Sequence, residues 1–331
     1  MDGWVGVIAA GIAFLVTAAG GAVLFPRDSG ARAQRIDGAQ TGKTPPPAGI
    51  LLFAGVVCGA CAGLSACAYA GQTAFDDPTN AALAGCAVFT AALFAMGTYE
   101  DMTLYRRCAN FVFAPRVTIA AQAGLTVSLL VWLKTNGAVS TAVLLPFQMG
   151  YAELGWLFYP LTTGAVLIII GGARSFSEAQ GTGIVTFLTA AAGLAAAAQL
   201  IGNTQISTVA LALGGAALGF LPVNFPPAGA LAGRGGAGFF AGAICGLCLM
   251  SGKAFLLLLC GGVLLIEKLT EALSVASYRL RGKNLLKERL LHRQLLEQTE
   301  NANRVILLYL SAGAVFALAA AAFAEFTRRV L

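Results

Sequence analysis

Residues 183–201 read GIVTFLTAAAGLAAAAQLI, a stretch without a single Asp, Glu, Lys or Arg. A helix rises 1.5 Å per residue, so about 20 apolar residues are needed to cross the roughly 30 Å hydrocarbon core of a bilayer. This stretch is long enough, and its many Ala and Gly residues suit the close packing of helices inside membranes. It therefore predicts a membrane-spanning helix that packs closely against other helices.

The rest of the chain repeats this pattern. Of its 331 residues, 58% are hydrophobic and 11% are charged, with a mean hydropathy of +0.78, whereas soluble domains carry about 25% charged residues. About ten runs are apolar enough to span a bilayer: 3–25, 49–71, 81–98, 112–133, 153–172, 183–201, 206–222, 237–251, 254–277 and 305–325. The fifth run is the least regular, because Pro146 and Pro160 also allow segment 134–160 to form an irregular external segment. We expect an all-α integral membrane protein in which residues 1–331 form a single polytopic domain.

Lys and Arg gather in alternate connections. The connections after the first, third, fifth, seventh and ninth runs hold nearly all of them, and the other side holds Lys134, Lys253, Arg328 and Arg329. Because short loops rich in Lys and Arg stay cytoplasmic, this predicts five inner loops and both termini outside. The first run has no basic segment before it, so we expect a retained helix and not a cleaved signal peptide. The net charge of +6 is explained by these loops beside anionic lipid, and no nucleic-acid partner is expected.

Two Cys-x-x-Cys pairs, Cys58 with Cys61 and Cys245 with Cys248, lie inside apolar runs. In a soluble chain this spacing would indicate a zinc site. Within a membrane span, cysteine behaves as a small buried hydrophobic residue, and we interpret both pairs in that way.

The inner loops share a second property, since each carries a short polar or Gly/Pro motif. In chain order these motifs are KTPPPAG (43–49), GTYED (97–101), APRVTIAAQ (114–122), RSFSEAQGTG (174–183), GFLPVNFPPA (219–228), GRGGAG (233–238), EALSV (271–275) and LLHRQ (290–294). In this order they resemble the motifs of the polyprenyl-phosphate phosphoglycosyl transferases, most of all the phospho-N-acetylmuramoyl-pentapeptide transferases (MraY). The block GFLPVNFPPA is the most specific, and the resemblance covers nearly the whole chain.

The resemblance implies a bacterial protein of the cytoplasmic (inner) membrane, a homodimer that moves a phospho-sugar from a UDP-sugar to polyprenyl phosphate. It also implies Mg²⁺ held by carboxylates at the inner membrane edge. The motifs carry over Glu100, Asp101 and Glu178 as catalytic candidates, and Lys43, Thr44, Gln122, Asn224, Arg234 and His292 as substrate-binding candidates. Asp101 is the candidate metal ligand, provided that Mg²⁺ is bound at all.

The chain departs from the family pattern where the chemistry would take place. Arg234 stands at the position of a metal-binding Asp, the third inner loop keeps only Glu178 of an acidic run, and only His292 remains of a triple-His motif. Two motif lysines are replaced by Leu104 and Thr118. A guanidinium about 5 Å from a divalent cation would repel it by about 7 kcal/mol at an effective dielectric near 20.

These departures leave three functions open. They favour a catalytically impaired paralogue that binds polyprenyl phosphate or a partner. Its role would lie in cell-envelope biosynthesis, in the pathway of the peptidoglycan lipid precursor. The alternative is a divergent active phosphoglycosyl transferase that uses Glu100, Asp101 and Glu178. A transporter that reuses the helix bundle is a third possibility, for which the nearly uncharged spans offer no support.

Arg234 itself has two interpretations. With Lys43, Arg106 and Arg174 it would grip the phosphate of a polyprenyl phosphate, because a guanidinium binds phosphate in a bidentate manner and keeps its charge. Alternatively, it would form an ion pair with Glu100 or Asp101 at the membrane edge.

Overall fold

The computed structural model describes residues 3–25, 47–71, 78–105, 114–144, 150–281 and 288–330. Their secondary structure is almost entirely helical. The helices are α1 (Gly3–Leu24), α2 (Gly49–Tyr69), α3 (Pro78–Tyr105), α4 (Pro115–Thr135), α5 (Phe158–Ser175), α6 (Thr182–Ile201), α7 (Thr204–Asn224), α8 (Gly233–Met250), α9 (Phe255–Cys260), α10 (Gly262–Arg281), α11 (Leu291–Thr299) and α12 (Ala302–Val330).

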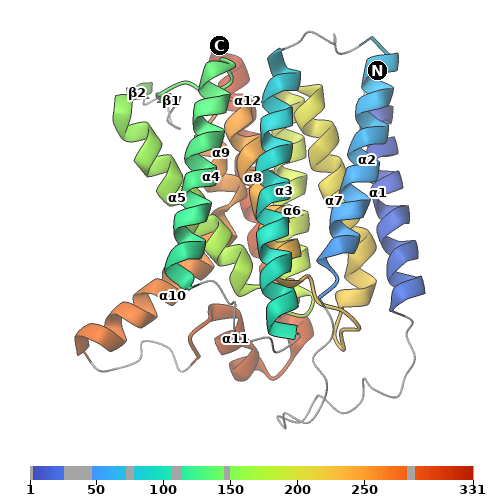
Figure 1. The fold of residues 1–331 in the computed structure, drawn as a ribbon, viewed down its shortest axis with the longest axis vertical. Helices are drawn as coiled ribbons and strands as arrows, with labels where there is room; N and C mark the ends of the chain where they lie inside the picture. Colours follow the sequence, from blue (N-terminus) through green and yellow to red (C-terminus); the bar gives the residue numbers. More distant parts are fainter. Residues whose placement is uncertain are drawn as a thin grey trace.

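Within these ranges, nine helices are long and apolar enough to cross a membrane, which confirms the expected all-α integral membrane fold. The expected ninth run, 254–277, is not one of them. It is divided at Gly261 into the short α9 and the longer α10. The run also contains Glu267, Lys268 and Glu271, and charged side chains are costly within a membrane span. The break instead lets α10 leave the bundle obliquely toward one end (Figure 1).

The segment that allowed two interpretations contains both an external hairpin and a span. Strands β1 (Ala142–Leu144) and β2 (Tyr151–Glu153) pair antiparallel, with Ala142 opposite Glu153. A 3-10 turn over Gly155–Leu157 then leads directly into α5. The span therefore begins a few residues later than the apolar run predicted.

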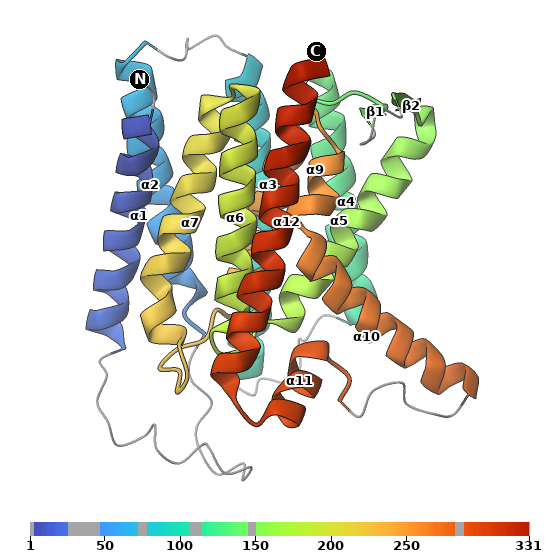
Figure 2. The same ribbon diagram turned by 180° about the vertical axis from the view of Figure 1, so that it is seen from behind.

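Both labelled chain ends lie at the same end of the bundle, and the inner-loop motifs gather at the opposite end (Figure 1; Figure 2 from behind). This requires an even number of crossings between the termini, so α9 and α10 together must return the chain across the bundle in addition to the nine long helices. The assignment of that opposite end to the cytoplasm stays a prediction.

Helix α8 is the central element. In α8, 94% of the span is buried inside the protein, compared with 22% in α1 at the periphery. Glycines permit this burial: a Cβ added at Gly97 of α3 would lie 2.5 Å from the carbonyl oxygen of Arg234. The first turn of α8 is thus pressed against the last turns of α3, which places the motifs of two inner loops in contact.

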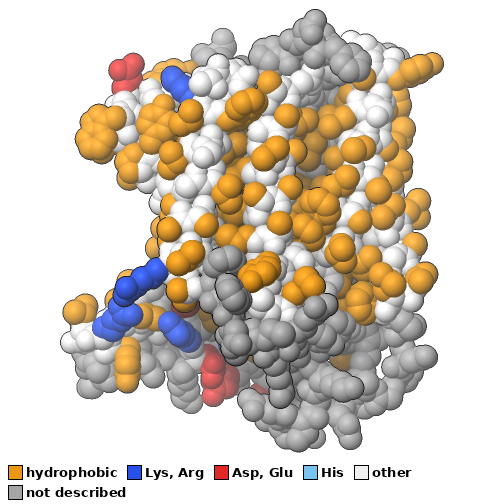
Figure 3. Space-filling view, viewed as in Figure 1, with side chains coloured by type: hydrophobic (Ala, Val, Ile, Leu, Met, Phe, Trp, Pro, Cys, Tyr) orange, Lys and Arg blue, Asp and Glu red, His pale blue; other side chains and the backbone are white. Residues whose placement is uncertain are grey.

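The outer surface of the bundle suits a lipid environment. Figure 3 shows hydrophobic side chains over the middle of the helices, and the coloured charged side chains of this face lie toward its two ends. Exposed residues such as Val7, Val88 and Leu318 belong to this apolar belt. The two cysteine pairs differ in exposure. Cys245 and Cys248 are buried in α8, as expected, whereas Cys58 and Cys61 lie on the exposed face of α2, contrary to the expectation that both pairs are buried.

Candidate functional site

Glu100, on the last turns of α3, is a buried carboxylate held by three side chains. Its exposed fraction is only 3%. Oε2 is ion-paired with the guanidinium of Arg174 from the end of α5 and with Nη1 of Arg234 at 3.2 Å. Oε1 accepts a hydrogen bond of 3.1 Å from Oγ1 of Thr118 on α4. One carboxylate therefore joins four helices at the end of the bundle that carries the motifs.

Asp101, the next residue, binds backbone and not side chain. Its Oδ1 accepts from the N–H of Arg234 at 3.0 Å, and Oδ2 accepts from the N–H of Gly235 at 2.9 Å. The first N–H groups of a helix have no partner within the helix, and a negative charge there is favourable. Asp101 thus completes the first turn of α8 from outside the helix.

The start of α8 requires glycine for this contact. Gly233 has φ of +71°, and a Cβ added there would lie 2.5 Å from Oδ2 of Asp101. The N–H of Gly233 donates to the carbonyl of Ser177 at 3.1 Å, so the third inner loop reaches the same point. The glycines of GRGGAG therefore allow α3, α8 and the third loop to meet.

The four charged groups at this point balance each other. Glu100 and Asp101 supply two carboxylates, and Arg174 and Arg234 supply two guanidinium groups. A Mg²⁺ site needs about six oxygen ligands at about 2.0–2.1 Å in an octahedral arrangement. Here both carboxylates already accept hydrogen bonds from cations or backbone, and no group of three or more His, Cys, Asp or Glu among the described residues is placed to hold a metal ion. Because Mg²⁺ is usually held by one or two carboxylates together with waters, the engagement of both carboxylates by cations and backbone N–H groups is the feature that disfavours such a site here.

Glu178, the third catalytic candidate, lies elsewhere. Its side chain is 68% exposed and pairs with Nη2 of Arg293 at 3.1 Å. This pair links the third inner loop to α11 and does not bring Glu178 to the cluster around Glu100. The family resemblance implied a shared site for these carboxylates; Glu178 pairs with Arg293, while the carbonyl of the adjacent Ser177 accepts from Gly233 at the start of α8.

Asn224, in the most specific motif, is completely buried at the end of α7. Its Oδ1 accepts from the N–H of Gly181 at 2.8 Å, and its Nδ2 donates to the carbonyl of Ala230 at 2.9 Å. Nearby, Ala228 donates its N–H to the side chain of Gln180. These contacts tie the third and fourth inner loops together, so Asn224 fixes the scaffold on which the cluster is built.

The remaining candidates are distributed around the same end. Gln122 is buried on α4, one turn beyond Thr118. Lys43, Thr44 and Arg106 lie outside the described residues. The neighbouring Ala48 donates its N–H to the carbonyl of Leu231 at 2.7 Å, which connects the first inner loop to the fourth.

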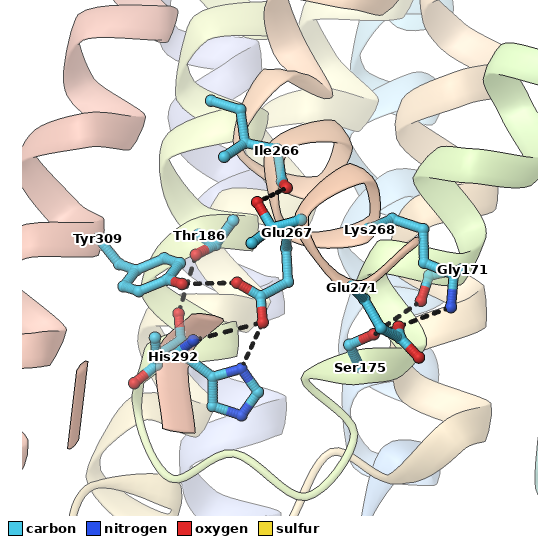
Figure 4. Close-up of polar contacts among 11 residues, drawn as sticks. Gly171, Ser175, Thr186, Ile266, Glu267, Lys268, Glu271, His292 and Tyr309 are labelled. Carbon is cyan, nitrogen blue, oxygen red and sulfur yellow. Dashed lines mark hydrogen bonds and ion pairs between the residues drawn. The ribbon is translucent and has the colours of Figure 1, made fainter. Parts of the chain in front are cut away.

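His292 belongs to a second polar cluster, with two residues that the motifs did not identify (Figure 4). Nδ1 of His292 lies 2.7 Å from Oε1 of Glu267 on α10, a carboxylate with no exposed surface. The hydroxyl of Tyr309 on α12 donates to Oε2 of Glu267 at 2.6 Å. A carboxylate in an apolar run was the available signal for Glu267. The sequence offered no signal for Tyr309, because its partner Glu267 lies 42 residues away in the chain.

Helix α10 also lines an open groove on the side of the bundle. The groove has a volume of about 440 Å³, and its lining combines the apolar Val275 and Leu280 with Lys268, Glu271 and Arg279. Lys268 pairs with Glu271 at 2.7 Å on the side of α10 away from Glu267 (Figure 4). The groove therefore combines an apolar surface with two cations and one carboxylate of α10.

Comparison with known proteins agrees with these motifs, although no family model matches the chain. It is 30% identical over 220 residues to a phospho-N-acetylmuramoyl-pentapeptide-transferase of Synechococcus sp. (strain JA-2-3B'a(2-13)), with 63% of this chain and 62% of that protein covered. The protein of the same name from Halalkalibacterium halodurans is 30% identical over 188 residues, with 56% and 57% covered. That from Nostoc sp. (strain PCC 7120) is 29% identical over 209 residues, with 60% and 56% covered.

The matched region thus spans less than two thirds of these relatives. The fold, the ordered inner-loop motifs and these similarities lead to one assignment. The chain is an MraY-like member of the polyprenyl-phosphate phosphoglycosyl transferase superfamily.

Proposed function

We propose that this protein acts in cell-envelope biosynthesis at the bacterial cytoplasmic membrane, where it binds polyprenyl phosphate and does not carry out Mg²⁺-dependent phospho-sugar transfer. The observation that carries the proposal is the state of the two inner-edge carboxylates. Glu100 is neutralised by Arg174 and Arg234, and Asp101 accepts two backbone N–H groups of α8. Both carboxylates therefore already have cationic or backbone partners, which disfavours metal binding.

The same arrangement suits an anionic ligand. Arg174 and Arg234 keep part of their surface, with exposed side-chain fractions of 20% and 36%. Each guanidinium carries five N–H donors, and only some of them bind Glu100. The remaining donors can bind phosphate oxygens in the fork geometry that arginine favours.

The groove along α10 suits the lipid part of the ligand. Its apolar lining would contact an isoprenoid chain, and its Lys268 end lies against Gly171 of α5, the helix that also carries Arg174. A UDP-sugar is a further ligand that the family likeness offers, and a homodimer is the assembly that it implies. Both stay proposals for this chain.

Binding of undecaprenyl phosphate to the purified protein in nanodiscs, with Mg²⁺ or with EDTA, tests this function. We expect saturable binding that does not depend on the metal, and weaker binding of undecaprenol, which lacks the phosphate. The variant Arg234→Ala should lose about 1.5–3 kcal/mol of binding free energy, the usual contribution of a hydrogen bond to a charged group. Unchanged affinity of Arg234→Ala would remove Arg234 from the ligand site, and binding that requires Mg²⁺ would favour the divergent transferase.

A further inference from the structure

The three tryptophans of the chain lie at the end of the bundle opposite the inner-loop motifs (Figure 1). Trp4 is near the start of α1, Trp132 is near the end of α4, and Trp156 comes just before α5. Their exposed fractions are 45%, 47% and 77%. Tryptophan and tyrosine gather where a membrane meets water, because their rings are apolar at one end and polar at the other. The tryptophans therefore mark this end of the bundle as a membrane boundary.

The β-hairpin between α4 and α5 is fixed to the core but leaves large side chains uncovered. Leu144 of β1 and Phe158 at the start of α5 are 5% and 1% exposed, and both belong to the core. In contrast, Tyr151 of β2 is 54% exposed, and Trp156 and Leu157 in the turn that follows are 77% and 44% exposed. The backbone of this segment is thus held in place while its aromatic and apolar side chains face the surroundings of the protein.

These side chains continue the apolar belt of the bundle. Leu161 of α5, four residues after Leu157, is 57% exposed. On α4, the neighbour of α5, Val127 and Val131 are 44% and 52% exposed. The apolar span 155–175 includes the turn that carries Trp156. The uncovered surface beside the hairpin is therefore continuous with the surface of the bundle that faces lipid.

The length of α5 places Trp156 at the boundary between hydrocarbon and headgroups. The 18 residues of α5 extend for about 27 Å, close to the roughly 30 Å thickness of the hydrocarbon core. Arg174 is near the far end of this helix, and a charged side chain is costly inside the hydrocarbon. With Arg174 at one boundary of the membrane, Trp156 lies at the opposite boundary.

We propose that the hairpin and the turn before α5 dock into the headgroup layer of the bilayer, with Tyr151 and Trp156 as interfacial anchors. The partner of this surface is a phospholipid layer, at the end of the bundle away from the inner-loop motifs. The strand β2 then lies on the membrane and does not stand in water above it. This surface is separate from the Arg174 and Arg234 ligand site, so the inference does not depend on the proposed function.

The chemistry of the two anchors suits this layer. The hydroxyl of Tyr151 and the indole N–H of Trp156 can donate hydrogen bonds to phosphate and ester oxygens, while the rings contact the upper part of the acyl chains. Leu157 and Leu161 are four residues apart and so lie on one side of the helix, where they extend the contact toward the hydrocarbon. None of these contacts requires a charged lipid, so a phosphatidylcholine bilayer is a sufficient partner.

A full-length protein that keeps Trp156 as its single tryptophan, with Trp4→Phe and Trp132→Phe, tests the depth of this side chain. Its fluorescence is measured in phosphatidylcholine nanodiscs whose lipids carry bromine either near the headgroup or near the chain end. Acrylamide serves as a quencher that stays in water. We expect stronger quenching by the shallow bromines than by the deep ones, and weaker quenching by acrylamide than for free tryptophan.

Two further reporters, each as the single tryptophan, complete the comparison. Tyr151→Trp reports on β2 itself and should also be quenched most by the shallow bromines. Leu318→Trp is the control, because Leu318 is 71% exposed near the middle of α12 and should be quenched most by the deep bromines. Trp132 donates its indole N–H to the carbonyl of Ala81. If Trp132→Phe does not fold, the single substitution Trp156→Phe should remove part of the shallow quenching of the wild type.

Three results would overturn the inference. Strong acrylamide quenching of the Trp156 or Tyr151→Trp reporter, without quenching by lipid, would place the hairpin in water. Protection from both kinds of quencher would show that protein covers the surface, for example a second copy of this chain. A depth profile equal to that of Leu318→Trp would place the segment in the hydrocarbon. None of these results would alter the binding of undecaprenyl phosphate, which is measured separately.

Discussion

Nη1 of Arg234 lies 3.2 Å from Oε2 of Glu100, and this ion pair stands where the family resemblance leads one to expect a carboxylate and a metal ion. The backbone of the same arginine binds Asp101. A single residue therefore engages both inner-edge carboxylates, one through its guanidinium and one through its N–H. This relationship gives the predictions that follow.

Replacing the cation by a carboxylate should restore an affinity for metal. In Arg234→Asp, repulsion of a divalent cation is removed and a third carboxylate is added beside Glu100 and Asp101. We expect Mg²⁺ or Mn²⁺ to raise the melting temperature of this variant. At a metal concentration of 100 times its Kd, the metal should stabilise the folded state by about 2.7 kcal/mol. The wild type should show no such shift. Arg234→Asn serves as the control, because it removes the cation without supplying a charge, and a shift of equal size there would contradict the explanation.

Removal of Arg174 should destabilise the fold through Glu100. Arg174→Leu leaves a carboxylate of 3% exposure with only one cationic partner. We expect a loss of about 1–3 kcal/mol in the free energy of unfolding, since an under-satisfied buried charge is costly. In a Glu100→Gln background the same substitution should cost much less. A double-mutant cycle from thermal or denaturant unfolding measures the coupling, and additive losses would show that the pair is not coupled.

Asp101 should contribute to stability as the external cap of α8. Asp101→Ala leaves the N–H groups of Arg234 and Gly235 without their acceptor. The expected cost is about 0.5–2 kcal/mol, as for other residues that cap helix starts. Asp101→Asn keeps one acceptor oxygen and should cost less. Equal stability of the alanine variant and the wild type would mean that α8 does not depend on this contact.

Close packing of α3 on α8 should make Gly97 intolerant of a side chain. A Cβ there would lie 2.5 Å from the carbonyl oxygen of Arg234, whereas a Cβ at Gly124 of α4 would meet nothing within 4 Å. We expect Gly97→Ala to lose about 1–3 kcal/mol from overpacking. Gly124→Ala should be neutral or stabilising by up to about 1 kcal/mol, because alanine is the better helix former. Similar melting temperatures for the two variants would argue against the close approach.

The fold was predictable from hydropathy because every crossing helix needs an apolar run, and the Lys and Arg pattern placed the motifs at one end. The division of 254–277 into α9 and α10 was not. Its apolar residues continue past Gly261, so hydropathy shows no interruption at that position. Hydropathy averages over a window and does not register a bend at one glycine.

The candidate site was predictable only in part. Motif order indicated that Glu100, Asp101 and Arg234 would meet, but residue type alone does not reveal whether a carboxylate binds a side chain or a backbone N–H, as Asp101 does. The same motifs suggested that Glu178 would join them, and it pairs with Arg293 instead. Glu267 and Tyr309 form their hydrogen bond only because α10 and α12 pack together.

The central claim is that the protein does not catalyse Mg²⁺-dependent phospho-sugar transfer, because Arg234 engages both Glu100 and Asp101. Its most direct test is the turnover of radiolabelled UDP-N-acetylmuramoyl-pentapeptide with undecaprenyl phosphate by the purified protein, with and without Mg²⁺, and with Asp101→Asn as the control. We expect no lipid-linked product under any condition, while undecaprenyl phosphate still binds. Product that depends on Mg²⁺ and is lost in Asp101→Asn would contradict this account and identify a divergent active transferase.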